Sequence, residues 1–238
     1  MGLFSTILHI YKKDQSDVVN RVTNELQPGY NIKKVNKIDA KSADFKSALV
    51  GQIRAGIVYL ITERHNNWIT IIEVAVNLNE PFYLYELTNG LSGRLKTYAL
   101  SFHLHDSDVL LYNLDKEGLA LDGYNSDYQY FLDAPAEVND ILSQRHSSQS
   151  FGGVLPESKN IDQLNAILNE GYWNAFDNNS LDTDGVPTDE YSVNEEEKFE
   201  RVGKYLEIFS DSEYLFTNWY RNQATLNLAH CYLLTGER

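Results

Sequence analysis

One six-residue segment, HLHDSD at residues 103–108, groups side chains that can bind a metal ion. His103 and His105 are two residues apart, so in a β-strand both side chains point to the same face. Imidazole and carboxylate groups are common ligands of transition metals, and Asp106 directly follows the second histidine. The segment therefore provides a candidate metal site at His103, His105 and Asp106, although it lacks the HExxH and CxxC spacings of familiar zinc sites.

The same segment has a second interpretation that involves no metal. Aspartates on both sides of Ser107 favour a tight turn, because their side chains accept hydrogen bonds from nearby backbone N–H groups. The two histidines then lie on the half-exposed face of the strand that precedes the turn. Elsewhere, Gly90 and Gly93 lack the spacing of a phosphate-binding loop, and no GxSxG motif occurs. The sequence therefore predicts no cofactor and no nucleophilic catalytic residue.

Tyrosine and aspartate side chains can form a surface that binds another protein. Three tyrosines fall within residues 124–130, flanked by Asp and Asn, and residues 177–197 hold eight acidic residues and no basic one. Tyrosine is enriched in protein interfaces, although core packing uses the same ring. The acidic segment is predicted to be a solvated loop. The candidate partner-binding residues from the two segments are Tyr124, Tyr128, Tyr130, Asp182, Asp184 and Asp189.

The chain is acidic, and its charge is unevenly distributed. It contains 34 Asp and Glu against 20 Lys and Arg, which gives a formal net charge of −14. Residues 1–150 have a balance of −4, whereas residues 151–238 have a balance of −10. A field of this sign repels phosphate backbones, so we expect no nucleic-acid binding. It attracts a basic partner protein, or it serves only to keep the chain in solution.

Several features predict the compartment. No apolar run approaches the roughly 18 residues that a membrane-spanning helix needs, so we expect no membrane insertion. Residues 1–13 place their lysines after the apolar stretch, unlike a secretory signal. Cys231 is the single cysteine, which excludes an internal disulfide and fits a reducing environment. Together these features predict a cytoplasmic protein.

The candidate residues belong to a predicted succession of strands and helices. Alternating or continuously apolar β-rich segments predict strands, and apolar stripes spaced by three or four residues predict helices. The strands are predicted at 4–11, 30–38, 56–62, 68–76, 98–104, 109–114 and 119–124. The helices are predicted from about Asp14 to 27, at 43–53, and after a cap at Asn79 and Pro81 with Leu84, Leu87, Leu91 and Leu95 on one stripe.

Beyond a polar, glycine-containing stretch at residues 146–157, the pattern becomes helical. One stripe covers residues 161–168, a Ser192–Glu195 capping box precedes a second helix, and a last helix is predicted at 211–235. We therefore predict an α+β fold, with a mixed or antiparallel sheet built from two βαββ-like halves and followed by a helical C-terminal part. The predicted division is a sheet domain at 1–146 and a helical part at 147–238, either separate or packed on the sheet.

Two resemblances accompany these patterns. Paired βαββ units with histidine and glutamate on strands resemble, in architecture, the vicinal-oxygen-chelate enzymes, which are metal-dependent proteins of the glyoxalase type. This resemblance implies a metal-dependent enzyme but transfers no motif residue by residue; the strand residues available as ligands are His9, Glu73, His103 and His105. Residues 105–131, with a DSDV turn followed by YNS and YF, resemble a segment of uncharacterised bacterial proteins. That second resemblance implies a bacterial origin and no activity.

Three functions fit the sequence. The first is a non-enzymatic, acidic protein-binding module, of the immunity or inhibitor type, that neutralises a basic partner protein. It fits the acidic bias, the many tyrosines and the lack of a recognisable catalytic set. The alternative is a metal-dependent enzyme of vicinal-oxygen-chelate-like architecture, built on the strand histidines and Glu73. A structural or regulatory subunit is the third.

Overall fold

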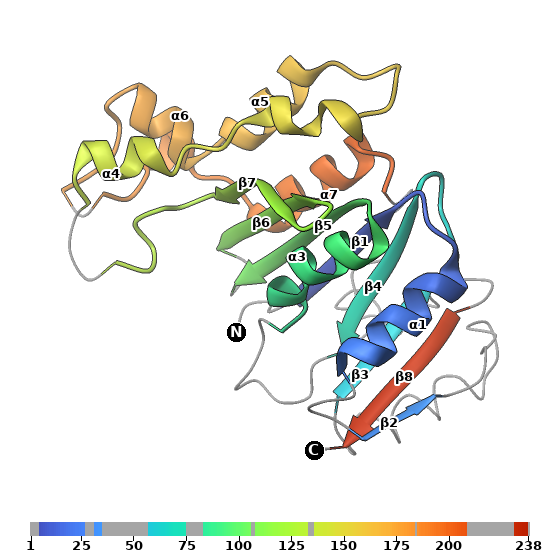
Figure 1. Cartoon of the computed structure of the whole chain (residues 1–238). Helices are drawn as coiled ribbons and strands as arrows, with labels where there is room; N and C mark the ends of the chain where they lie inside the picture. The colour runs from blue at the N-terminus through green and yellow to red at the C-terminus, as the bar shows by residue number, and fades with distance from the viewer. Residues whose placement is uncertain are drawn as a thin grey trace.

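The computed structural model has an α+β fold, with helices on both faces of one antiparallel sheet (Figure 1). It describes residues 5–26, 31–34, 57–74, 83–105, 108–132, 136–183, 185–208 and 231–237. The predicted α+β class and antiparallel sheet are confirmed. The predicted helix at 43–53 and the cap at Asn79 and Pro81 lie outside the described residues.

The sheet contains eight strands in the order β2-β8-β3-β4-β1-β5-β6-β7. β1 lies between β4 and β5, so it joins β2, β8, β3 and β4 on one side to β5, β6 and β7 on the other. Hairpins connect β3 to β4 and link β5, β6 and β7 in succession. The bounds are β1 Ser5–Tyr11, β2 Asn31–Lys34, β3 Ile57–Thr62, β4 Trp68–Val74, β5 Tyr98–His105, β6 Val109–Lys116, β7 Leu119–Asn125 and β8 Cys231–Glu237.

The helices form two groups. The first group consists of two long helices that lie between strands in the chain: α1 Gln15–Leu26 follows β1, and α3 Tyr83–Leu95 precedes β5. The others follow β7, and they are α4 Val138–Ser143, the 3-10 turn η1 Ser148–Gly153, α5 Ile161–Asn169, α6 Tyr172–Asp177, the 3-10 turn η2 Asp189–Tyr191 and α7 Glu195–Tyr205. None of the helices in the described part is long and apolar enough to cross a membrane.

The first helical group covers one face of the sheet. Val18 and Val22 of α1 and Leu91 of α3 are fully buried against strand residues such as Leu8 and Ile61. Their spacing of three or four residues places the apolar side chains on one side of each helix. The leucine stripe that predicted α3 is therefore a packing face.

The second helical group covers the opposite face, over β5, β6 and β7 (Figure 1). Phe199 of α7 contacts Phe102 of β5 with 5.1 Å between ring centroids, and Leu164 of α5 joins the same cluster. Because strand side chains alternate between faces, the sheet builds both cores from a single set of strands. The helical residues from 161 to 205 thus pack directly on the sheet.

The last strand corrects the sequence-based prediction. Residues 231–235 were predicted to end a helix, but Cys231–Glu237 forms β8, which pairs with both β2 and β3. Leucine suits a helix as well as a strand, and partners distant in the sequence decide between them. The segment 147–238 is therefore not entirely helical, and its last strand completes the sheet. Residues 211–230 of the predicted helix lie outside the described residues.

Phe199→Ala tests the packing of the helical group on the sheet. The side chain is 1% exposed, so its removal leaves a cavity, and the free energy of unfolding is expected to fall by about 3–5 kcal/mol. Urea unfolding followed by circular dichroism measures this change. Val138→Ala, at an apolar residue of α4 that is 59% exposed, is the control and costs less than about 1 kcal/mol. Equal effects of the two variants would contradict the packing described.

Candidate functional site

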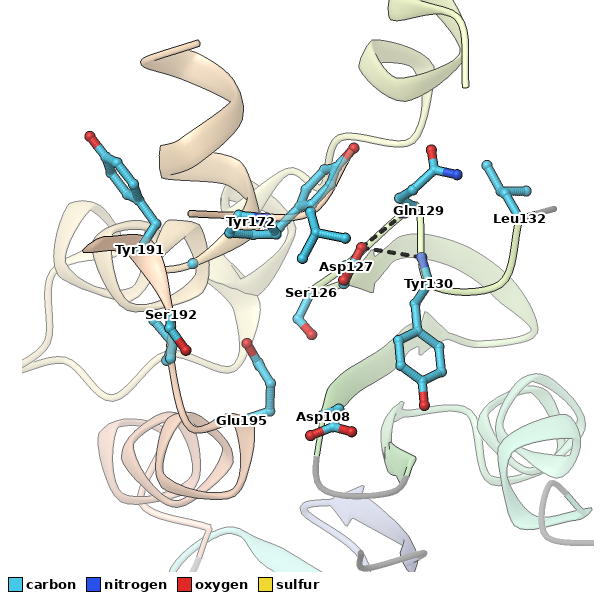
Figure 2. A pocket seen from close by; sticks show the side chains of 14 residues that line it. Asp108, Ser126, Asp127, Gln129, Tyr130, Leu132, Tyr172, Tyr191, Ser192 and Glu195 are labelled. Atoms are coloured by element: carbon cyan, nitrogen blue, oxygen red, sulfur yellow. Dashed lines mark hydrogen bonds between the residues drawn. The ribbon is translucent and has the colours of Figure 1, made fainter. Parts of the chain in front are cut away.

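A cavity of about 680 Å³ lies where the turn after β7 meets the segments that precede α6 and α7 (Figure 2). This volume is typical of small-molecule and side-chain pockets. Three carboxylates, from Asp108, Asp127 and Glu195, line it, so we call it the acidic cavity. The remaining lining residues are Ser126, Gln129, Tyr130, Leu132, Gly171, Tyr172, Val186, Pro187, Tyr191, Ser192 and Val193.

The turn that carries Asp127 is fixed by side chains bonding to the backbone. Asn125 Oδ1 accepts a hydrogen bond from the Asp127 N–H, and Asp127 Oδ1 accepts from the N–H groups of Gln129 and Tyr130. Aspartate and asparagine favour such turns because their short side chains reach backbone donors two or three residues ahead. As a result, one oxygen of Asp127 is anchored and the carboxylate has a defined direction, as Figure 2 shows.

A buried ion pair forms the other side of the cavity. Glu195 Oε1 lies 2.6 Å from Lys198 Nζ, which also donates to the Glu170 carbonyl at 2.7 Å and to the Tyr124 hydroxyl at 3.2 Å. The Tyr124 hydroxyl in turn donates to the Leu168 carbonyl. Lys198 is fully buried and Glu195 is 4% exposed. These bonds connect β7, the end of α5 and the first turn of α7.

Backbone geometry at Gly171 brings the chain close to this pair. Its φ of 81° lies in the left-handed region, which favours glycine. A Cβ at this position would lie 3.6 Å from both Glu195 Oε1 and Lys198 Nζ. The start of α6 therefore covers the ion pair closely, and the Trp173 indole N–H donates to the Asn125 carbonyl and holds α6 against the end of β7.

Burial sets the protonation behaviour of the cavity carboxylates. Burial raises the pKa of Glu195 most strongly, and Lys198 and the Ser126 hydroxyl oppose that rise. The pKa of Asp127 is also raised by burial, against its two backbone hydrogen bonds and the charge of Lys198. For Lys198, burial lowers the pKa and the contact with Glu195 opposes the change. A cation placed between the carboxylates would stabilise their charged forms.

The structure places the predicted partner-binding residues in different environments. Tyr130 is 41% exposed and lines the acidic cavity, whereas Tyr128 is half-buried against the core of the sheet. Tyr124 was expected to belong to a binding surface, but it is 3% exposed because its hydroxyl is bound within the chain beneath the cavity. Asp182 is exposed and its Oδ1 accepts from the Val186 N–H.

The two other predicted acidic residues cannot be placed as side chains. Asp184 lies outside the described residues, and of Asp189 the structure describes the backbone, at the start of η2. Val186 and Pro187, which lie between them, line the acidic cavity. The acidic segment therefore borders the cavity through residues 186–187, 191–193 and 195.

Of the candidate metal ligands, His103 and His105 lie near each other, with 6.0 Å between their ring centroids. His103 and Thr6 are cross-strand neighbours, and His103 Nδ1 lies 2.8 Å from Thr6 Oγ1. His9 is three residues beyond Thr6 on the same strand, so it points to the opposite face of the sheet. Within the described ranges, no three His, Cys, Asp or Glu side chains are close enough to hold a metal ion. Asp106 and the Glu73 side chain lie outside the described part.

The prediction of a half-exposed histidine face is also corrected. His103 is fully buried, because its face of β5 is the one that α1 and α3 cover, and His105 is half-buried. The His105 ring contacts Tyr130 and Phe131, with centroid distances of 5.6 and 5.2 Å. His105 is thereby linked to the turn that carries Asp127, and so to the wall of the acidic cavity.

The sequence pattern did not predict the cavity, because its walls come from segments that are distant in the sequence. Glu195 was predicted to complete a capping box with Ser192, but the helix cap is Asn194, whose Oδ1 accepts from the Glu197 N–H. Glu195 instead turns inward to Lys198. The spacing Glu195-x-x-Lys198 is the signal that was available, since residues three apart on a helix are neighbours.

Comparisons with protein-family models, with curated proteins and with solved structures give no match to this chain. The functional argument therefore depends on the geometry and chemistry of the site itself.

Lys198→Met tests the buried ion pair. Removal of the ammonium leaves Glu195 buried without its cation, and the free energy of unfolding is expected to fall by about 3–5 kcal/mol. Adding Glu195→Gln to this variant should recover part of the loss, because the uncompensated charge disappears. Arg201→Met on the same helix removes an exposed pair with Glu170 and should cost at most about 1 kcal/mol. Urea unfolding measures all three, and a Lys198→Met effect no larger than that of Arg201→Met would contradict the assignment.

The buried histidines predict a loss of stability in acid. Burial lowers the pKa of His9 to about 3 and, together with the charge of His105, that of His103 to about 4, from an ordinary value of 6.5. Between these values the unfolded chain binds more protons than the folded one, so stability falls as the pH falls below about 6.5. Between about pH 6.5 and 4.5, the wild type should therefore lose about 2 kcal/mol of unfolding free energy through His9, and His9→Gln should abolish that part of the loss.

Urea unfolding at the two pH values measures the loss of stability in each protein. Ile7→Ala, on the same face of β1, is the control and should lower stability by the same amount at both pH values. If His9→Gln keeps the full acid dependence, His9 is not the group that takes up the proton.

Proposed function

We propose that this protein is an acidic, non-enzymatic binding module that docks a basic partner protein at the acidic cavity. The observation that carries the proposal is the convergence of three carboxylates on one cavity, with a single lysine behind them. Lys198 is fully buried and engaged with Glu195, so Asp108 and Asp127 keep the cavity negative. An inhibitor or immunity protein that neutralises a basic protein would use a face of this kind.

The rim of the cavity supports binding of a protein surface. Tyr130, Leu132 and Val186 are each between 40% and 45% exposed, and all three line the cavity. Phe131, beside them in the chain, is 48% exposed. Apolar and aromatic rim residues around a polar centre are typical of interfaces in which one inserted side chain supplies much of the binding energy.

The charge of the whole chain supports the same function. A net charge of −14 raises the association rate of a basic partner, and this steering weakens as salt screens it. Binding should therefore depend on ionic strength through the association rate, and on the cavity carboxylates through the dissociation rate.

The double variant Asp108→Asn, Asp127→Asn tests the proposal. Wild-type protein immobilised at low salt is expected to retain a basic protein from a cell lysate. The purified partner should then bind the double variant with a Kd at least about tenfold higher, which corresponds to a loss of about 1.4 kcal/mol of binding free energy. Surface plasmon resonance measures both affinities. Asp162→Asn, at an exposed residue of α5, is the charge control and should bind as the wild type does.

Two outcomes would overturn the proposal. One is capture of partners that are not basic. The other is equal binding of the purified partner to the wild type and to the double variant, which would place the interface elsewhere.

A further inference from the structure

Asp127 presents one oxygen that the fold leaves available. Oδ1 accepts two backbone hydrogen bonds, at 3.0 Å from Gln129 N and 3.2 Å from Tyr130 N, and no described group donates to Oδ2. The carboxylate is therefore oriented before any ligand arrives. Figure 2 shows Asp127 at the centre of the cavity, beside Ser126 and the ring of Tyr172.

Glu195 presents a second oxygen that lacks a hydrogen bond. The side chain is 4% exposed, its Oε1 is held by Lys198, and Oε2 is buried without a hydrogen-bond partner among the described residues. The Ser126 hydroxyl lies near enough to lower the pKa of the carboxyl. A buried acceptor without a donor costs stability, so a ligand that donates to it gains affinity. Glu195 lines the same cavity as Asp127.

Aromatic side chains line the space around these two carboxylates. Tyr130, Tyr172 and Tyr191 all contribute to the wall, and Tyr172 is held rigidly against Trp173 with 5.4 Å between ring centroids. Aromatic faces attract cations, and the planar guanidinium group also stacks on them. The cavity therefore combines fixed acceptors with flat apolar walls.

We infer that the acidic cavity binds a guanidinium group, as carried by an arginine side chain, between the carboxylates of Asp127 and Glu195. This inference rests on the proposed function and names the group that the partner inserts. A guanidinium has five N–H donors in fixed coplanar directions, which suits two carboxylates held on different elements. An ammonium group is more strongly hydrated and loses more on approaching the nearly buried Glu195.

Calorimetric titration of the full chain with blocked amino acids tests the inference. The probes are acetyl-arginine-methylamide, the corresponding lysine compound and the neutral citrulline compound, which has the shape of arginine without its charge. The arginine probe is expected to bind with a Kd of about 1 mM or below and at least about tenfold more tightly than the lysine probe. The citrulline probe should show no binding at the same concentrations.

Variants locate the probe in the cavity. Asp127→Asn should weaken binding of the arginine probe at least about tenfold. Asp162→Asn should leave the affinity unchanged, and thermal melting confirms that each variant is folded. Equal binding of the lysine and arginine probes would overturn the guanidinium assignment, as would an affinity for the arginine probe that Asp127→Asn leaves unchanged.

Further measurements distinguish a guanidinium group on a protein from one on a small molecule, and distinguish failure of this inference from failure of the proposed function. An arginine side chain of a protein predicts that the blocked probe binds at least as tightly as free arginine or agmatine. Tighter binding of agmatine or free arginine would instead identify a small-molecule ligand and contradict a protein partner.

If a basic protein binds through Asp108 and Asp127 while no guanidinium probe binds, the inference fails and the proposed function stands. If the arginine probe binds but no basic protein does, the proposed function alone fails.

Discussion

The ion pair between Glu195 and Lys198 is the interaction on which the arrangement of the helical group depends. Lys198 Nζ is the point where three segments meet, because it contacts the side chains of Glu195 and Tyr124 and the carbonyl of Glu170. An ammonium in this position requires that all three acceptors be present, since a buried charge without them is strongly unfavourable. The hydrogen bonds of Lys198 Nζ thus constrain how residues 160–205 pack together. The apolar side chains of Phe199 and Leu164 belong to the core cluster that the same segments form.

This constraint also produces the acidic cavity. Lys198 binds Oε1 of Glu195, the second oxygen of that carboxylate has no hydrogen-bond partner among the described residues, and the residue lines the cavity. The same lysine fixes Tyr124, whose neighbours Asn125, Ser126 and Asp127 form the turn on the other wall. The buried ion pair and the proposed binding cavity therefore share one carboxylate, and the position of the cavity follows from the contacts between α7 and β7.

Local pattern predicted much of the sheet and the two stripe helices, because the information needed for them lies within each segment. The leucine spacing of α3 and the alternation of β5 and β6 are examples. The rest depends on partners distant in the sequence. β8 is a strand because β2 and β3 lie on either side of it, and Tyr124 is buried because the Leu168 carbonyl, 44 residues away, accepts from its hydroxyl. The cavity was not predicted for the same reason: Glu195 has the spacing of a cap, and its partner Lys198 is buried by contacts with Tyr124 and Glu170, 74 and 28 residues away.

The electrostatics of the cavity are the physical basis of the cationic ligand that we propose. Burial raises the pKa of both Asp127 and Glu195, and the charge of Asp127 adds to the rise at Glu195. Lys198 opposes the rise at both carboxylates, and its hydrogen bonds go to Glu195, Glu170 and Tyr124. A second positive group from outside the chain, as proposed, would relieve the remaining cost of ionising the two carboxylates. A cation that donates hydrogen bonds relieves more of it than a cation that interacts by charge alone, because the buried oxygen of Glu195 also requires a donor. The proposed selectivity thus depends on an acceptor that the described residues leave without a hydrogen bond.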